Sequence, residues 1–190
     1  MRKNFLKFKG GKTMRIAIAA THGAGKTKFA QGLAKAIGGN YIHDIVREEA
    51  IPKGFKFNKN TPPEVQLWLT MRQWELEMLT PEPWVADKCL LDYLVYGDIL
   101  IKDQEIMKMV KRIVESSARY NLVFYFPIEF EMEEDGFRSK ELQPVIDAAY
   151  KEYLEKRGIK YITLPSFIKE SSSKEEAIKK RINLALNYIK

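Results

Sequence analysis

The sequence of 190 residues has one cysteine, Cys89, and two histidines. A single cysteine cannot form an internal disulfide and excludes a cysteine-rich metal scaffold, so the composition fits a reducing compartment. The histidines, His22 and His43, have no partner at a metal-ligand spacing. No apolar run reaches about 18 residues, as a membrane-spanning helix would require. Residues 1–13 also lack the apolar stretch of a secretory signal. We therefore expect a soluble, cytoplasmic protein.

Acidic residues are missing from the first 13 residues, MRKNFLKFKGGKT, which hold five cations. The chain carries a net charge of +7, so the rest of the sequence carries only +2. We interpret residues 1–13 as a flexible, solvated basic tail, and contact with the phosphates of a nucleic acid is the alternative. Residues 14–190 are enough for one buried domain and too few for two full-sized ones.

Strand-like and helix-like segments alternate along this domain. Short apolar runs predict strands at residues 15–20, 40–46, the start of 82–92, 121–128 and 159–165. Apolar residues at helical spacing predict helices at residues 26–37, 63–79, around 93–100, 105–120, 142–158 and 173–190. Strands separated by helices favour an α/β fold, in which a parallel sheet lies between helices on both faces.

The first strand-to-helix junction carries a glycine-rich motif. Residues 20–27 read ATHGAGKT, and the Walker A pattern is G-x-x-x-x-G-K-[ST]. Gly25, Lys26 and Thr27 occupy their expected positions, whereas Ala20 replaces the first glycine. Alanine fits there if its φ is negative and would be strained if φ were positive. Because the motif follows a predicted strand and opens a predicted helix, we interpret it as a phosphate-binding loop. The alternative is a glycine-rich turn that binds nothing.

The residue types in this loop suit a triphosphate. Small residues let successive backbone N–H groups approach phosphate oxygens, and the start of the helix adds unsatisfied N–H groups and a positive dipole end. Lys26 is a mobile charge for the β- and γ-phosphates, and the Thr27 hydroxyl is a hard ligand for Mg²⁺. We therefore predict ATP and Mg²⁺ as cofactors, bound by the loop residues His22, Gly23, Ala24, Gly25, Lys26, Thr27 and Lys28.

Two aspartates follow predicted strands, at the edge where open parallel sheets bind ligands. Asp44 lies near the end of the second strand, and Asp87 lies at the end of the third. A carboxylate beside bound phosphates can hold Mg²⁺, directly or through water, or accept a proton from an attacking hydroxyl. We predict that Asp87 serves Mg²⁺ and that Asp44 is the base on the acceptor side. The alternative for each is a helix N-cap.

Further polar residues belong to the predicted substrate site. Arg47 is assigned to the acceptor or to a phosphate, and an ion pair with a neighbouring glutamate is its alternative. Asp92 and Tyr96 share a helix face, and Asp92 is assigned to the substrate site. On helix 63–79, Gln66 and Gln73 belong to a polar stripe whose amides suit the edge of a base. A solvated helix face is the equal alternative for that stripe.

Residues 129–141, EFEMEEDGFRSKE, form a predicted charged loop. A mobile cation on this loop, Arg138, would close over the γ-phosphate, stabilise charge in the transition state and exclude water. We therefore interpret the loop as a small lid with Arg138 as a catalytic residue. The alternative is a solvated acidic loop, because five acidic residues precede Arg138 and could pair with it locally.

These motifs together resemble the P-loop nucleoside and nucleotide kinase superfamily, and most closely its ribosylnicotinamide kinase-like group of AAA-type ATPases. The matching features are the ATHGAGKT loop, an acid followed by arginine at residues 44 and 47, the stretch Asp87, Lys88, Asp92 and Tyr96, and residues 135–138, DGFR. The departures are Ala20, Asp44 for glutamate and Lys88 for arginine. The resemblance implies a P-loop NTPase fold, with a five-stranded parallel sheet in the order 2-3-1-4-5 and a helical lid.

The predicted function is transfer of a phosphoryl group from Mg-ATP to a nucleoside, nucleotide or related small molecule. One alternative is a kinase for a DNA or RNA hydroxyl that uses the basic tail and the last helix. Another is a non-catalytic switch that senses ATP or GTP. The N/T-K-x-D signature that reads guanine is absent, since residues 58–61 read NKNT, and this favours ATP. We expect a monomer or homodimer without a membrane partner.

Overall fold

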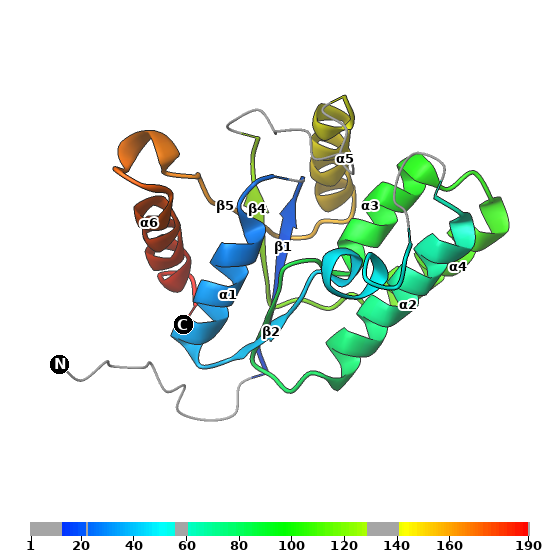
Figure 1. Cartoon of the computed structure of the whole chain (residues 1–190), viewed down its shortest axis with the longest axis horizontal. Helices are drawn as coiled ribbons and strands as arrows, with labels where there is room; N and C mark the ends of the chain where they lie inside the picture. The colour runs from blue at the N-terminus through cyan, green and yellow to red at the C-terminus, as the bar shows by residue number, and fades with distance from the viewer. Residues whose placement is uncertain (1–12, 22, 56–60, 129–140, 190) are drawn as a thin grey trace.

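A computed structural model of the chain describes residues 13–21, 23–55, 61–128 and 141–189 (Figure 1). Five parallel strands form one sheet in the order β2-β3-β1-β4-β5. The strands are β1 (Arg15–Ala20), β2 (Asn40–Ile42), β3 (Trp84–Ala86), β4 (Leu122–Phe126) and β5 (Ile162–Thr163). The strand order and the parallel pairing predicted from the family resemblance are therefore confirmed.

Six α-helices connect and cover these strands in the described residues. They are α1 (Lys26–Ile37), α2 (Pro63–Leu79), α3 (Leu90–Leu100), α4 (Gln104–Ser117), α5 (Leu142–Lys156) and α6 (Lys174–Leu186). A short π-helix, η1 (Val46–Ala50), and a 3₁₀ turn, η2 (Ile168–Glu170), complete the described elements. None of these helices is both long and apolar enough to cross a bilayer.

Alternate residues of β1 supply both halves of the core. Ile16 and Ile18 pack with α1 and α6 on one face of the sheet. Ala17 and Ala19 pack with residues of α3, α4 and α5 on the other face. Figure 1 shows α1 and α6 together on one side of the strands and α2 to α5 on the other. The predicted three-layer arrangement is confirmed, and it places the loop after β1 at the carboxyl edge of the sheet.

Most predicted segments appear with small shifts, but the second strand is shorter than predicted. Residues 40–46 read as one strand, whereas β2 ends at Ile42 and a helical turn follows. Asp44 starts this turn. Its carboxylate accepts a hydrogen bond from the Val46 amide, and its carbonyl accepts hydrogen bonds from the amides of Arg47 and Glu48. Local side-chain bonding thus overrides the apolar pattern. The fifth strand, predicted at 159–165, is limited to two residues.

Candidate functional site

The loop between β1 and α1, the P-loop, follows the central strand of the sheet. Gly23 and Gly25 adopt φ angles of 77° and 76°, a left-handed conformation that favours glycine. No atom lies within 4 Å of a Cβ built on Gly25, so backbone conformation rather than space requires glycine there. The methyl group of Ala24 lies in the core. Ala20 is the last residue of β1 and has no positive φ, so alanine is unstrained at the departure from the motif.

Lys26 opens α1 and lies buried beneath this loop. Its Nζ donates hydrogen bonds to the carbonyls of Ala20, at 2.7 Å, and Thr21, at 2.9 Å. Burial lowers the pKa of the Lys26 amine, and the carboxylates of Asp92 and Asp87 oppose that effect. The Lys26 amine thus donates to two neutral acceptors in a buried position, and phosphate oxygens can replace these acceptors.

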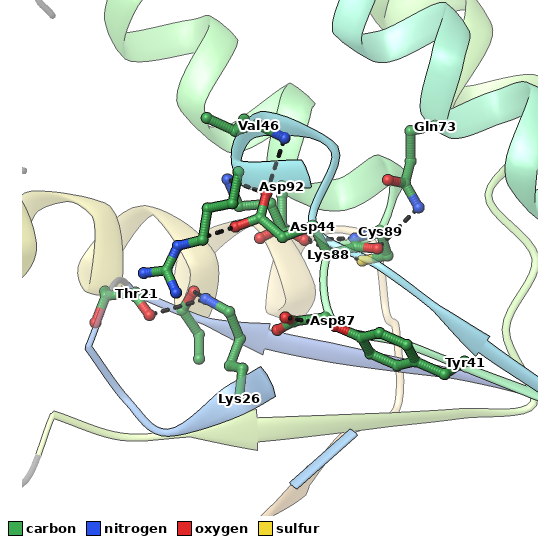
Figure 2. A network of polar contacts seen from close by, with 12 residues as sticks. Thr21, Lys26, Tyr41, Asp44, Val46, Gln73, Asp87, Lys88, Cys89 and Asp92 are labelled. Carbon is green, nitrogen blue, oxygen red and sulfur yellow. Dashed lines mark hydrogen bonds and ion pairs between the residues drawn. The ribbon is translucent and has the colours of Figure 1, made fainter. Parts of the chain in front are cut away.

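Asp87 comes directly after β3 and faces the start of α1. Burial raises the pKa of its carboxyl, while Lys26 and a hydrogen bond from the Thr27 hydroxyl oppose this shift. The Tyr41 hydroxyl donates to Oδ2 at 3.2 Å. Figure 2 shows Asp87 beside Tyr41. A hydroxyl and a buried carboxylate in contact are the hard oxygen ligands that Mg²⁺ prefers, alongside water and phosphate.

Asp44 lies among three cations. Burial favours its neutral form, but Lys88, Lys26 and Arg47 outweigh this effect and lower the pKa of the carboxyl. The Lys88 Nζ lies 3.4 Å from Oδ1 and the Arg47 Nε 3.7 Å from Oδ2. The Val46 amide also donates to Oδ1, so Asp44 begins the helical turn and remains ionised beside the P-loop (Figure 2).

These predicted residues meet in one cavity of about 590 Å³, which we call the P-loop cavity. Its lining includes most of the P-loop, both aspartates, Arg47 and Lys88 on one side, and residues after β5 on the other. From the predicted set, the cavity is lined by Gly23, Ala24, Gly25, Lys26, Thr27, Lys28, Asp44, Arg47 and Asp87. Segments distant in sequence therefore bring a phosphate-type loop, two carboxylates and six cationic side chains to one place.

Comparison with known proteins agrees with this geometry. A family model described as an AAA domain matches residues 15–171, which include β1, the P-loop and both aspartates. The chain belongs to this AAA-domain family. No curated protein matches the sequence.

Solved structures share the fold of this AAA-domain protein at low sequence identity. Deoxyadenosine kinase from M. mycoides, solved with dCMP and dCDP bound, is 18% identical with a TM-score of 0.61, covering 93% of this chain and 98% of its own. NadR in complex with NR is 15% identical with a TM-score of 0.70, covering 90% of this chain and 52% of its own. Thymidylate kinase from Ehrlichia chaffeensis is 10% identical with a TM-score of 0.62, and the match covers 95% of this chain and 100% of the thymidylate kinase. These likenesses show that the chain shares its fold with these proteins.

Three predicted substrate residues do not line the P-loop cavity, namely Gln66, Gln73 and Asp92. Gln66 and Gln73 are 8% and 0% exposed, so the alternative of a solvated helix face is wrong. The Gln73 amide nitrogen donates to the Lys88 carbonyl at 2.8 Å, beside the cavity wall. The Asp92 carboxylate accepts bonds from the Cys89 amide, at 2.8 Å, and the Tyr150 hydroxyl, at 2.6 Å. Gln73 and Asp92 thus hold the backbone that follows Asp87.

Two groups of residues near the site carry no motif in the sequence. The far wall of the cavity is built from residues after β5 and on α6, namely Ser166, Ile168, Lys174, Ala177, Ile178 and Arg181. No motif marks this wall, because it depends on the packing of α6 beside α1. The second group centres on Glu77, a buried carboxyl whose only sequence signal is its spacing of four residues from Gln73.

Some predicted residues lie outside the described part of the chain. These are His22, the basic tail apart from Thr13, and residues 129–140 of the proposed lid, including Arg138. Among the described residues, no group of three or more histidine, cysteine, aspartate or glutamate side chains could hold a metal ion. Thr27 and Asp87 would supply two ligands of Mg²⁺, and phosphate oxygens and water would supply the others. Mg²⁺ is usually bound in this manner.

Proposed function

We propose that the protein is a Mg-ATP-dependent kinase that phosphorylates a nucleoside, a nucleotide or a related small molecule. The observation that carries this proposal is the single cavity that joins the P-loop to Asp44, Arg47 and Lys88. A module that only binds nucleotide needs the loop, but a kinase also needs a polar acceptor side next to it. The kinase-type fold supports the same conclusion.

The P-loop side would bind and stabilise the triphosphate. Left-handed glycines flank Ala24, and such turns point successive amides into an anion-binding concavity. Lys26 would exchange its two carbonyl acceptors for phosphate oxygens. Thr27 and Asp87 would hold Mg²⁺, which neutralises phosphate charge when bound. Arg138, in the proposed lid, would add a further cation to the γ-phosphate.

Asp44 would orient the acceptor. Its lowered pKa keeps the carboxylate ionised at neutral pH, so it can accept a hydrogen bond from an attacking hydroxyl. The bond between the γ-phosphorus and the bridging oxygen breaks, its electron pair leaves with ADP, and a new P–O bond forms to the acceptor oxygen. The acceptor proton passes to Asp44 and then to solvent. A weak base suffices because a loose phosphoryl transition state needs little proton removal.

Arg47 and Lys88 would bind anionic or polar groups of the acceptor. Arg47 is half-exposed at the cavity, whereas Lys88 is buried against Asp44. The structural neighbours named for deoxyadenosine and thymidylate act on nucleoside-type acceptors, and this supports an acceptor of that class.

A panel of acceptors tests the proposal. The full chain would be incubated with Mg-ATP labelled at the γ-phosphate and with deoxyadenosine, ribosylnicotinamide, thymidylate or an oligonucleotide with a free 5′ hydroxyl. We expect a phosphorylated small molecule, identified by mass. Phosphorylation of the oligonucleotide alone would favour the polynucleotide kinase, and slow hydrolysis without any phosphorylated acceptor would favour the switch.

A further inference from the structure

Arg181 on α6 makes an unusual set of contacts for a residue near the end of the chain. Its side chain is only 4% exposed, and its guanidinium carbon lies 3.9 Å from the centroid of the Phe126 ring. Three of its nitrogens donate to main-chain carbonyls: Nη1 to Ala24 at 3.0 Å, Nε to Pro165 at 2.6 Å and Nη2 to Leu164 at 3.1 Å. Arg181 lies beyond the family-matched residues, which end at 171.

The bond to Ala24 acts directly on the P-loop. In a trans peptide, the carbonyl and the following N–H group point in opposite directions. When Arg181 holds the Ala24 carbonyl on the α6 side, the Gly25 N–H is directed to the other side of the same peptide plane. Gly25 has a left-handed φ and begins α1, so this peptide lies in the anion-binding turn.

The other two bonds attach the same guanidinium to the opposite wall of the P-loop cavity. Leu164 and Pro165 follow β5 and lead into Ser166 and Ile168, which line that wall. The planar guanidinium can satisfy three carbonyls in one geometry, while its face stacks on Phe126. A lysine would keep the positive charge but could not donate three hydrogen bonds in this planar arrangement. Figure 1 shows α6 beside α1, on the same side of the strands.

We propose that Arg181 is a positioning residue that sets the Ala24–Gly25 peptide for phosphate binding and couples it to the segment after β5. This inference rests on the proposed function only in requiring that the P-loop binds phosphates. Arg181 acts through the backbone it holds. Its role therefore depends on the guanidinium geometry and not on positive charge alone.

Substitutions that separate charge from geometry test this role. Binding of magnesium tripolyphosphate and Mg-ATP would be measured by calorimetry for the full chain, Arg181→Lys and Arg181→Met. Hydrogen bonds from charged groups are strong enough for us to expect about 10-fold or greater loss of affinity in both variants. Lys179→Met removes one charge from the exposed side of α6 and should leave affinity unchanged. Wild-type affinity in folded Arg181→Lys would overturn the proposal.

Hydrogen exchange distinguishes positioning from general destabilisation. With magnesium tripolyphosphate bound, the Gly25 amide of Arg181→Lys should exchange faster than in the unaltered chain, while the amides paired between β1 and β4 keep their protection. Equal acceleration at both places would show a merely structural role and overturn the proposal.

The unaltered chain provides a readout that does not depend on a variant that folds. Addition of magnesium tripolyphosphate should shift the Arg181 Nε–H resonance together with the Gly25 amide. A shifted Gly25 amide with an unmoved Arg181 Nε–H would overturn the inference alone. Failure of the wild-type chain to bind either tripolyphosphate or Mg-ATP would instead overturn the proposed function.

Discussion

Lys26 keeps its side chain in a site where solvation is poor. Burial lowers the pKa of its amine, and neighbouring carboxylates and two carbonyls partly replace the lost water. Such a group interacts strongly with any anion that enters, because the local dielectric is low. The chemistry assigned to the P-loop therefore depends most on this residue.

Removal of the Lys26 charge gives the first prediction. Lys26→Ala should reduce the rate of phosphoryl transfer about 100-fold or more, because preorganised charge at the transferring group is lost. Steady-state kinetics with labelled ATP measures this effect. Lys35→Ala, at the exposed end of the same helix, is the matched control. Near-normal turnover in a folded Lys26→Ala variant would count against the account.

The second prediction concerns Asp44. Asp44→Asn should retain ATP affinity and lose most of the transfer activity, because a neutral amide lacks the charge that orients the attacking hydroxyl and cannot accept its proton. Since cations lower the pKa of this carboxyl below its usual value of 3.8, wild-type Asp44 stays ionised at pH 5 and above. Any fall in the rate as the pH drops toward 5 therefore comes from another group. The residual activity of the variant should show the same fall. Unchanged transfer would assign the acceptor contact to another residue.

Helices α2 and α3 are joined by a buried carboxyl, Glu77. Its Oε1 accepts hydrogen bonds from the Leu90 amide at 2.9 Å and the Gln73 amide nitrogen at 3.0 Å, and the Tyr120 hydroxyl donates to Oε2 at 2.9 Å. Burial raises the pKa of Glu77 to about 7, although these donors oppose the shift. The network fixes the start of α3, just after Asp87 and Lys88.

This network predicts a pH-dependent stability. Between pH 4.5 and about 7, the folded chain keeps a proton on Glu77 that the unfolded chain has lost, so stability falls as pH rises. Glu77→Gln should abolish that part of the decline, which is about 3 kcal/mol at ~1.4 kcal/mol for each unit of pKa shift. Urea unfolding at several pH values measures it, with exposed Glu75→Gln as control. A wild-type pH profile in Glu77→Gln would contradict the assignment.

At the scale of elements, sequence patterns predicted best where local signals decide the structure. Helix 63–79 begins with proline and ends near another, and its observed bounds are the predicted ones. Helix 26–37 is likewise unchanged, because a glycine with a left-handed φ ends it. The second strand was overestimated because Asp44 turns the backbone, which the apolar pattern does not report. The buried role of Gln73 was open from sequence, since glutamine is equally suited to solvent.

The whole molecule shows why half of the site was predictable. The P-loop, Asp44 and Asp87 each follow a strand of a parallel sheet, so the order of elements alone brings them to one edge. The opposite wall, with Arg181, depends on how α6 packs across α1, and no local pattern encodes this contact. The family match ends at residue 171, so it covers Ser166 and Ile168 of that wall but not the α6 residues, Arg181 among them.

All of the proposed chemistry requires that the backbone amides of the P-loop bind a triphosphate. The most direct measurement is a titration of the full, isotope-labelled chain with Mg-ATP, followed through the amide resonances of Gly23, Ala24, Gly25, Lys26 and Thr27. We expect these resonances to shift together and saturate, whereas magnesium and adenosine without phosphates should leave them in place. Resonances that stay unmoved at saturating Mg-ATP would contradict it.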